Sequence, residues 1–358
     1  MSNPHHYGLI LAGGRGTRFW PRSRRRTAKQ VLNVVGSRSL IQDTVTRLES
    51  VIPPERLWVL TNDFLREEIV RQLPQVPESQ ILAEPVQRNT TPAIGLAAHI
   101  LHSIDPDAVM GVFPADHVVG KAGRFRQLVR AAYRHAGRGR IVVLGIVPRW
   151  PETGYGYIEF PKGTSPGAQP VPIRRFREKP DLATARRYVA SGRHLWNAGM
   201  FFWRADVLLG ELRRHAPRTA SILAALPAFR DPAFGVKVSE AFPLCENISI
   251  DYAVLEKARE VHGIACDEIE WSDVGSWNAV YELVPRDGSR NAVPRHAIAV
   301  DSTGNFVDAG TKTVALLGVS DLIVIDTPDA LLVAHRDRAQ QVSEIVKTLE
   351  KQKRDELL

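Results

Sequence analysis

LILAGGRGTRFWPRSRRRTAKQ, residues 9–30, joins an apolar run to a glycine-rich and then a strongly basic segment. The apolar part is typical of a buried strand, and Gly13, Gly14 and Gly16 follow it directly. Glycine lets the backbone turn sharply and bring its N–H groups close to an anion. Because open α/β sheets bind ligands at the carboxyl ends of their strands, the stretch predicts an anion-binding loop at such an edge.

Two familiar phosphate loops do not match this stretch. The dinucleotide pattern GxGxxG requires a glycine where Phe19 stands, and no GK[ST] follows for a P-loop. The stretch contains no acid, but its cations are Arg15, Arg18, Arg22, Arg24, Arg25, Arg26 and Lys29. Such a run can be a solvated basic face or a nucleic-acid patch, but its start on a glycine loop favours a polyphosphate cradle. Arg18 and Lys29 are the first candidate contacts, and Arg24–Arg26 can be surface charge only.

Short apolar runs alternate with helical patterns along the first half of the chain, which predicts a parallel sheet with helices on both faces. The expected strands are Tyr7–Ala12, Leu57–Thr61, Ile81–Ala83, Val109–Phe113 and Ile141–Ile146. The expected helices are Leu40–Leu48, Phe64–Leu73, Pro92–Ile104 and Phe125–Ala136. Thr91 is the expected N-cap of the third helix.

The pattern changes twice in the second half. Strands are expected among loops and helices at Tyr157–Phe160, Ile173–Glu178 and Met200–Trp203. Closely spaced short strands then follow at 297–301, 313–317, 322–326 and 330–334, before a charged helix at 339–353. We therefore expect an α/β domain over residues 1–290 and a small β-rich domain over residues 291–358.

Composition is that of a soluble globular protein. The 358 residues are enough for one large α/β domain and a smaller one, and the net charge of +8 favours anionic ligands without choosing among them. Cys245 and Cys266 form neither a CxxC nor a metal-ligand spacing. No segment approaches the roughly 18 apolar residues of a membrane span, so a cytoplasmic protein without a membrane partner is expected.

Two acids stand where a metal ion could be held. Asp116 follows the apolar strand 109–113, where a carboxylate can hold Mg²⁺ against phosphates, although such a residue is more often a helix cap or turn residue. Asp273 lies in the aromatic segment WSDVGSW and supplies a second carboxylate. Two carboxylates completed by substrate phosphates form a typical Mg²⁺ site, and no Cys/His spacing suits zinc. His117 is expected to be structural.

Further polar residues suit a phosphorylated sugar and a nucleotide. Glu178 and Lys179 are adjacent and project to opposite sides of an extended chain, so one can bind hydroxyls and the other a phosphate. An exposed charge pair on an edge strand explains them equally well. Asn197 adds an amide, which donates and accepts and therefore suits a diol. The segment 84–92 joins a strand to a helix, and its polar groups could read a base or ribose.

The chain resembles the mannose-1-phosphate guanylyltransferase family in motifs that follow one another in the same order: AGGRGTRFWPRSR, KQ, EPVQRNTTPAI, FPADH, TGYGYIEF, FREKPD, WNAGMFFW, SIDYAVLEK and WSDVGSW. GGRGTR belongs to the wider sugar-nucleotidyltransferase superfamily, whereas WPRSR, RNTTPAI and WSDVGSW together are specific to the guanylyl branch. The resemblance covers nearly the whole chain. It implies a Rossmann-like nucleotidyltransferase domain with a mixed, mostly parallel sheet, followed by a short left-handed β-helix.

The resemblance also implies an activity and its residues. GMP would pass from GTP to α-D-mannose 1-phosphate by direct in-line attack, with Mg²⁺ bound by Asp116 and Asp273. The catalytic residues would be Arg18, Lys29 and Lys179. The nucleotide would lie against Leu11, Ala12, Gly13, Gly14, Arg15, Gly16, Thr17, Glu84, Arg88 and Asn89, and the sugar against Gly154, Glu178 and Asn197.

Two departures from the family and two rival functions remain. Ala28 stands where proline usually precedes the lysine, which loosens that turn, and the chain stops before the isomerase domain of some relatives, so a monofunctional enzyme is expected. The family favours a homodimer. The rivals are a guanylyltransferase for another sugar 1-phosphate, such as a manno-heptose, and a non-catalytic paralogue that binds the nucleotide sugar. DNA binding through Arg22–Arg26 is not expected, because no helix-turn-helix signal is present.

Overall fold

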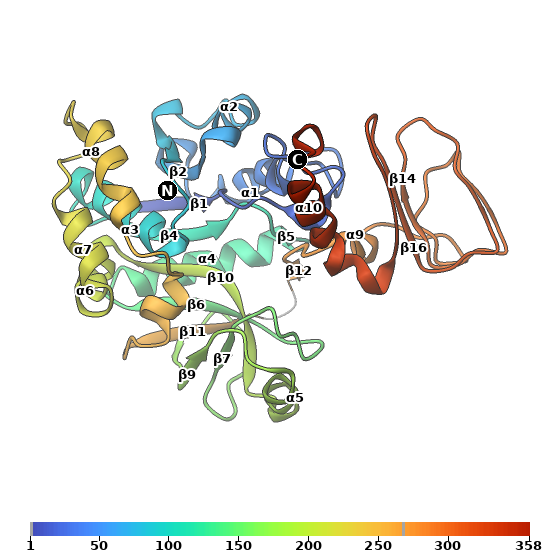
Figure 1. Cartoon of the computed structure of the whole chain (residues 1–358). Helices are drawn as coiled ribbons and strands as arrows, with labels where there is room; N and C mark the ends of the chain where they lie inside the picture. Colours follow the sequence, from blue (N-terminus) through green and yellow to red (C-terminus); the bar gives the residue numbers. More distant parts are fainter. Residues whose placement is uncertain (1–2, 267–268) are drawn as a thin grey trace.

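The structure, a computed structural model, describes residues 3–266 and 269–358 (Figure 1). Its centre is a sheet of these strands in spatial order: β3 (Ile81–Glu84), β2 (Leu57–Asn62), β1 (His6–Leu11), β4 (Val109–Pro114), β10 (His194–Arg204), β6 (Ile141–Ile146), β11 (Val261–Cys266) and β8 (Val171–Pro172). β1 pairs in parallel with β2 and β4, and β6 with β11, whereas β10 runs antiparallel between β4 and β6. The predicted mixed, mostly parallel α/β sheet is confirmed.

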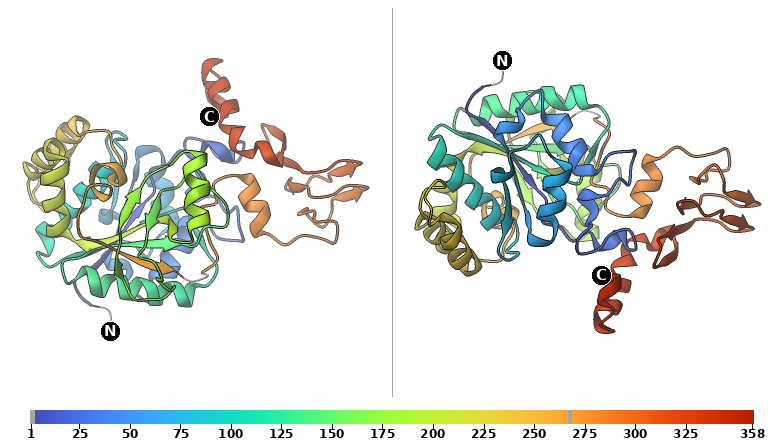
Figure 2. Two further views of the ribbon diagram at one scale, coloured as in Figure 1. Left: turned by 90° about the horizontal axis from the view of Figure 1, so that it is seen from below. Right: turned by 90° about the horizontal axis from the view of Figure 1, so that it is seen from above.

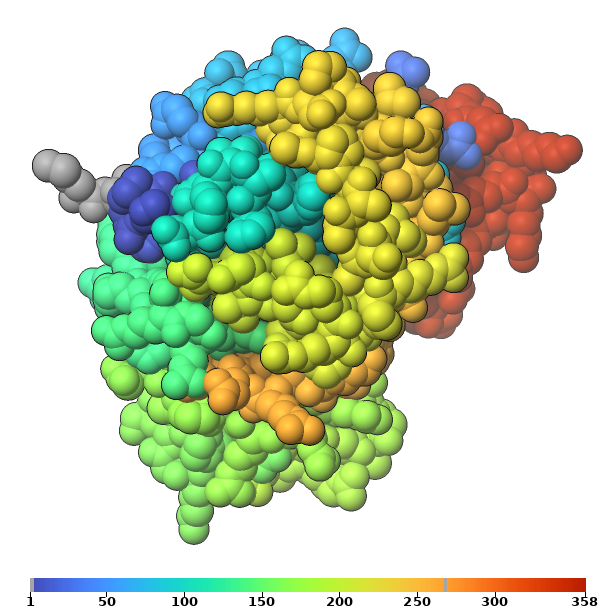
Figure 3. All heavy atoms as spheres, turned by 90° about the vertical axis from the view of Figure 1, so that its left-hand side faces the viewer, coloured from blue at the N-terminus to red at the C-terminus, as the bar shows by residue number. Residues whose placement is uncertain are grey.

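Helices cover both faces of this sheet (Figures 1 and 2). One layer holds α1 (Leu40–Leu48), α2 (Asp63–Gln72) and α4 (Ala122–Ala136). The other holds α3 (Thr90–Ile104), α6 (Ala205–His215), α7 (Pro217–Ala224) and α8 (Phe234–Ala241), and Figure 3 shows these as one continuous surface. Successive strand residues point to opposite faces, so Leu9 packs under the second layer and Ile10 under the first.

Small pairings at the carboxyl edge of the sheet bring distant segments together. β5 (Val118–Val119) and β12 (Trp271–Ser272) pair antiparallel, so the residues beside them are neighbours although about 150 positions separate them. β7 (Tyr157–Glu159) pairs with β10 and with β9 (Arg175–Arg177), and α5 (Leu182–Ser191) packs against β10. These additions form the walls around the end of the main sheet.

The C-terminal strands extend to one side of the α/β domain (Figures 1 and 2). β13 (Ile298–Val300) pairs in parallel with β15 (Ala315–Leu317), and β14 (Phe306–Asp308) with β16 (Leu322–Asp326), in both cases between residues 17 positions apart such as Ile298 and Ala315. Parallel pairing at a constant offset is the mark of a β-helix coil. Buried Asn305 links the coils, because its Nδ2 donates to Asn291 Oδ1 at 3.0 Å. The predicted β-rich tail is confirmed, while the boundary at residue 290 stays a prediction.

Three further elements join the two parts. α9 (Trp277–Leu283) precedes the coil, whereas β17 (Leu331–His335) and α10 (Val342–Lys351) follow it. Their apolar side chains share one core with the basic segment near the N-terminus: Trp277 is fully buried, and its ring centroid lies 5.0 Å from that of Phe19. Trp277 Nε1 also donates to the backbone oxygen of Trp20 at 3.1 Å. The C-terminal elements therefore support the segment that follows the glycines.

The structure corrects two local expectations. Thr91 is not the N-cap of α3: the helix begins at Thr90, Asn89 caps it, and Thr91 is buried in the first turn. β10 is longer than expected, because the whole of His194–Arg204 is strand and its register shifts between Asn197 and Phe201. A bulge of this kind re-aims side chains near the sheet edge.

Among the described residues, no helix combines the length and the apolar character that crossing a membrane requires. The cytoplasmic location and the homodimer stay predictions.

Candidate active site

The glycine loop, residues 12–17, is held by side chains that bind its carbonyl groups. Gln30 Nε2 donates to Gly14 O at 3.0 Å, and Gln87 Nε2 donates to Gly13 O at 2.5 Å. Within the described part of the chain, the N–H groups of these two glycines and of Arg15 donate to no acceptor. A loop whose carbonyls are fixed and whose N–H groups are free is a nest for an anion.

Lys29 lies directly behind the glycine loop and is buried. Gly16 has a φ of 60°, and a Cβ there would lie 2.7 Å from Lys29 Cβ, so the close approach requires glycine. Lys29 Nζ donates to Asp116 Oδ2 at 2.8 Å and to the backbone oxygen of Asp273 at 2.5 Å. Ala28 has a φ of −69°, the value that proline would impose. The backbone before Lys29 is therefore already in the conformation that proline favours.

The two candidate metal ligands, Asp116 and Asp273, meet around Lys29 because β5 and β12 pair beside them. Burial is the largest single influence on the pKa of Asp116 and would raise it, but the Lys29 ammonium, His117 and the hydrogen bonds to the carboxylate together hold the pKa below its usual value. Tyr155 OH donates to Asp273 Oδ1 at 2.5 Å. Burial, followed by this neighbouring carboxylate, raises the pKa of Tyr155, so its hydroxyl stays a donor. The Asp116 carboxylate is thus ionised at neutral pH.

The donor set around these acids fits a hard divalent cation completed by a ligand. Across residues 3–266 and 269–358, no group of three or more His, Cys, Asp and Glu side chains could form an all-protein metal site. Two carboxylates with open positions for phosphate and water suit Mg²⁺. His117 is not a charged partner, because burial lowers its pKa to about 4, and its Nδ1 accepts from Trp271 Nε1 at 3.3 Å.

A cluster of polar side chains, Glu178, Asn197 and Asp251, lies at the bulge of β10. Asn197 Nδ2 donates to Asp251 Oδ1 at 3.0 Å, and Asn197 Oδ1 accepts from the N–H of Gly199 at 3.0 Å. Glu178 Oε2 is buried without a hydrogen-bond partner in the described chain, and a Cβ on Gly156 would collide with it. A buried carboxylate oxygen costs free energy unless something donates to it. This polar cluster is therefore suited to a ligand that carries hydroxyl groups.

Asp251 belongs to this polar cluster, although no role for it is predicted from the sequence. It begins η6 (Asp251–Leu255), a π-helical turn of a kind that is frequent at functional sites. Burial and the nearby carboxylate of Glu178 raise the pKa of Asp251 to about 7. The SIDYAVLEK motif contains it, but nothing in that motif distinguishes it from an ordinary helix-start residue. Gly154, by contrast, is exposed, and its N–H donates to Glu152 Oε1 at 2.8 Å.

Lys179 lies beside this polar cluster, and its side chain is 55% exposed. Its Nζ lies 3.1 Å from Glu178 Oε1, and its φ of 41° is in the left-handed region that side chains rarely adopt. The N–H of Glu178 donates to Glu256 Oε1 at 2.8 Å, which fixes the backbone just before this strained residue. Strain of this kind persists where the surroundings fix the conformation, and it is common at ligand sites.

The segment between β3 and α3 borders the glycine loop. A Cβ on Gly13 would lie 3.7 Å from Glu84 Oε2, and burial raises the pKa of Glu84 to about 8. Arg88 Nε is buried and has no hydrogen-bond partner in the described residues. Asn89 Oδ1 instead accepts from the Thr90 N–H at 2.9 Å. Glu84 and Arg88 therefore keep polar atoms available, whereas the side-chain oxygen of Asn89 caps a helix.

Four arginines of the basic segment form ion pairs with acids of the C-terminal part, and we call these pairs the arginine clasp. The pairs are Arg15–Glu350 at 2.6 Å, Arg22–Asp308 at 2.6 Å, Arg24–Asp329 at 3.0 Å and Arg25–Asp355 at 3.0 Å. Arg18, in η1 (Thr17–Phe19), is exposed and pairs with no acid in the described chain. The basic run is thus divided: Arg18 and Lys29 stay beside the glycine loop, while four of the other arginines pair with acids of the C-terminal part.

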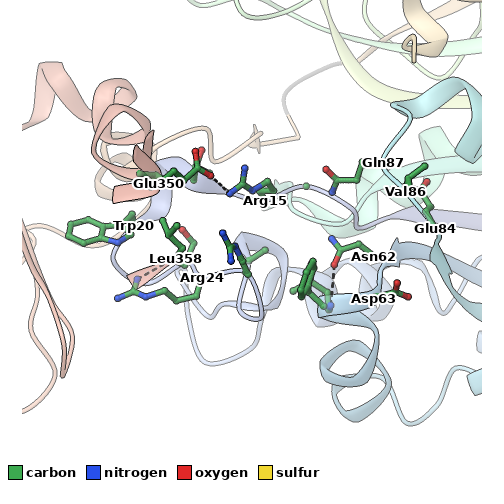
Figure 4. Close-up of a pocket in the computed structure, with 18 of the residues that line it drawn as sticks. Arg15, Trp20, Arg24, Asn62, Asp63, Glu84, Val86, Gln87, Glu350 and Leu358 are labelled. Atoms are coloured by element: carbon green, nitrogen blue, oxygen red, sulfur yellow. Dashed lines mark hydrogen bonds and ion pairs between the residues drawn. The ribbon is translucent and has the colours of Figure 1, made fainter. Parts of the chain in front are cut away.

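A cavity of about 510 Å³ lies between the glycine loop and α10 (Figure 4). Arg15, Glu84, Gln87 and Glu350 are among the residues that line it. Neither Lys29 nor the two acids beside it belong to its walls. The cavity therefore lies next to the candidate active site, on the side of the loop that faces the C-terminal helix.

Two family models match the chain. The model described as Nucleotidyl transferase covers residues 7–290, and the model described as MannoseP isomerase/GMP-like beta-helix domain covers residues 295–349. Both models therefore fall on regions that the structure shows as the α/β part and the β-helix part.

Curated relatives and a solved structure match over nearly the full chain. A mannose-1-phosphate guanylyltransferase of Escherichia coli is 38% identical over 353 residues, which is 97% of this chain and 74% of that protein. The xanthan biosynthesis protein XanB of Xanthomonas campestris pv. campestris is 40% identical over 354 residues, again 97% of this chain and 74% of the relative. A crystal structure described as mannose-1-phosphate geranyltransferase from Thermus thermophilus has a TM-score of 0.85 at 33% identity and covers 97% of this chain and 99% of its own.

Proposed function

The chain belongs to the nucleotidyl transferase family, and from that premise we propose that it transfers GMP from GTP to α-D-mannose 1-phosphate, giving GDP-mannose and pyrophosphate. The observation that carries the proposal is the meeting of the glycine loop, buried Lys29 and two aspartates at one edge of the sheet. The relatives named mannose-1-phosphate guanylyltransferase support the choice of nucleotide and sugar.

The reaction exchanges one phosphorus–oxygen bond for another. An oxygen of the sugar phosphate attacks the α-phosphorus of GTP, and the bond from that phosphorus to the bridging oxygen of pyrophosphate breaks. The attacking phosphate is already anionic, so no side chain has to remove a proton from it. Positioning and neutralisation of phosphate charge are therefore the main tasks of the protein.

The chain supplies groups for each of these tasks. We infer that the free N–H groups of the glycine loop and Arg18 hold the triphosphate, and that Lys29 neutralises the departing pyrophosphate. Lys179 takes the sugar phosphate, while Glu178, Asn197 and Asp251 bind hydroxyl groups of mannose. Enzymes of this family use a divalent metal, and we propose Mg²⁺ held by Asp116 and Asp273. When bound, the ion neutralises charge on the phosphates.

Pyrophosphate release tests the function directly. The purified chain would be assayed with Mg²⁺ and every combination of GTP, ATP, UTP and dTTP with mannose, glucose and manno-heptose 1-phosphates. Turnover confined to GTP and mannose 1-phosphate is the expected result. Turnover with GTP and a different sugar would replace the sugar in the proposal. Absence of turnover from the folded protein would favour a regulatory nucleotide-sugar-binding role.

Replacement of Lys179 separates the sugar phosphate from the nucleotide. Lys179→Ala should raise the KM for mannose 1-phosphate about tenfold, because a charge-assisted contact to phosphate is lost. The KM for GTP should change less than about twofold. Steady-state kinetics with each substrate varied in turn measure both values. Arg175→Ala on nearby β9 is the control and should change neither. Equal increases in the two KM values would show that Lys179 does not bind the sugar phosphate.

Replacement of Glu84 tests whether it reads the base. An ionised Glu84 can accept from both N1–H and the 2-amino group of guanine, whereas ITP lacks that amino group. Glu84→Gln should therefore reduce the preference for GTP over ITP about tenfold in kcat/KM. Because the pKa of Glu84 is raised to about 8, the carboxylate fraction grows with pH. The preference of the unsubstituted protein should thus increase between about pH 7 and pH 9, whereas that of Glu84→Gln should stay level.

The control for this base test is Glu67→Gln, the same substitution at an exposed position of α2. It should keep the preference for GTP over ITP and the pH dependence of that preference. A Glu84→Gln variant that still prefers GTP as strongly as the unsubstituted protein would remove Glu84 from the base site.

A further inference from the structure

One pair of the arginine clasp differs from the other three. Arg15 belongs to the glycine loop itself, and its guanidinium lies 2.6 Å from Glu350 Oε1 on α10 (Figure 4). The other three clasp arginines lie after η1, outside the loop. The N–H groups of residues 13–15 are free for an anion, but the guanidinium of Arg15 is occupied by a carboxylate of the other domain.

We propose that Glu350 competes with the phosphates of the bound nucleotide for Arg15, so that α10 acts as an internal brake on the glycine loop. The proposal rests on the proposed function, because it requires a nucleotide triphosphate at this loop. Arg15 would pair with Glu350 in the empty protein and with phosphate oxygens in the loaded one. This exchange replaces one ion pair of Arg15 with another and involves no covalent bond.

The exposure of the pair makes such an exchange feasible. The Arg15 side chain is 49% exposed and that of Glu350 is 36% exposed, and ion pairs in such positions are weak. A phosphate group offers Arg15 a stronger, charge-assisted partner. There is also space for the glycine loop and the Arg15 side chain to change conformation. A Cβ on Gly14 would meet nothing within 4 Å, and Arg15 lines the cavity of about 510 Å³. If Arg15 served only to stabilise the fold, its exposed ion pair would add little to the free energy of unfolding.

Removal of the competitor should tighten nucleotide binding. In Glu350→Gln, the Kd for Mg²⁺-GTP measured by titration calorimetry should fall roughly two- to fivefold, because Arg15 no longer has to leave a charged partner. The KM for GTP should fall by the same factor while kcat stays within about twofold. In an Arg15→Ala background, Glu350→Gln should have no further effect on Kd.

Asp355→Asn is the matched control, because it also removes one negative charge from a clasp pair in the same C-terminal segment. Its partner Arg25 lies outside the glycine loop, so the Kd for GTP should stay within about 1.5-fold of the unsubstituted value. This control separates the loss of competition from a general gain in positive potential.

The outcomes are distinct. An unchanged or higher Kd in Glu350→Gln, or an equal decrease in Asp355→Asn, would overturn the brake while leaving the proposed function in place. A decrease that persists in the Arg15→Ala background would also overturn it, because Glu350 would then act without Arg15. If the unsubstituted protein bound none of GTP, ATP and UTP, the proposed function would be wrong, and the brake with it.

Discussion

Asp273→Asn should lower kcat about a thousandfold while leaving the fold intact. The substitution removes one negative charge from the proposed metal site and changes little else. The asparagine oxygen can still accept from Tyr155 OH, and the backbone oxygen of residue 273 can still accept from Lys29. Asp116→Asn should also abolish turnover, but it additionally leaves the buried Lys29 ammonium without its carboxylate partner. Asp273 is therefore the cleaner test of a metal-binding acid.

The measurement combines turnover with a readout of metal binding. Pyrophosphate release would be followed over a range of Mg²⁺ concentrations, and Mn²⁺ binding would be titrated separately in the presence of GTP. Tyr155→Phe is the control: it removes the hydrogen bond to Asp273 but keeps the charge, and its kcat should fall less than about tenfold. Near-normal turnover in Asp273→Asn, with unchanged Mn²⁺ affinity, would remove Asp273 from the metal site.

Trp277→Ala should reduce the free energy of unfolding by about 3–5 kcal/mol. Trp277 is fully buried between the two domains, and its ring centroid lies 5.0 Å from that of Phe19 and 5.9 Å from that of Phe306. Its Nε1 donates to the backbone oxygen of Trp20, so truncation removes packing and one hydrogen bond at the same point. A void of this size cannot close, because strands of the β-helix and the basic segment form its walls.

Urea unfolding followed by far-ultraviolet circular dichroism would measure the loss. Phe64→Ala removes an aromatic side chain that is 59% exposed, and it should change the free energy of unfolding by less than about 0.5 kcal/mol. Trp277→Phe should be intermediate, because it keeps a ring in the space. A loss in Trp277→Ala no larger than that in Phe64→Ala would show that this core does not hold the domains together.

Much of the fold could be predicted because its elements are local patterns. The periods of apolar residues located α1 at Leu40–Leu48 and β6 at Ile141–Ile146, with the bounds that the structure has. β10 could be recognised only in part, because its 11 residues are apolar on both faces and contain a glycine at the bulge. A central strand without alternation is difficult to separate from a loop and a short strand.

The residues of the candidate site, like the elements of the fold, could be predicted from the sequence only in part. The glycine loop and Asp116 follow strands directly, and topology alone places such residues at the sheet edge. The arginine clasp could not be predicted, because Arg15 and Glu350 are 335 positions apart and their pairing depends on how the β-helix folds back. Asp251 was not assigned because its role depends on Asn197, which reaches it from β10, a distant segment of the chain. Contacts between distant segments are set by packing, which residue patterns in one sequence do not show.

The joint between the basic segment and the C-terminal helices has a consequence for the order in which the protein becomes active during its synthesis. The indole of Trp20 donates to the backbone oxygen of Leu357, a partner 337 positions later in the chain. At about 5–20 residues per second, a ribosome makes the second partner roughly 15–70 s after the first. The glycine loop is therefore translated well before the C-terminal residues that support the segment following it, so a nascent chain carries the candidate site residues of this loop before their support exists.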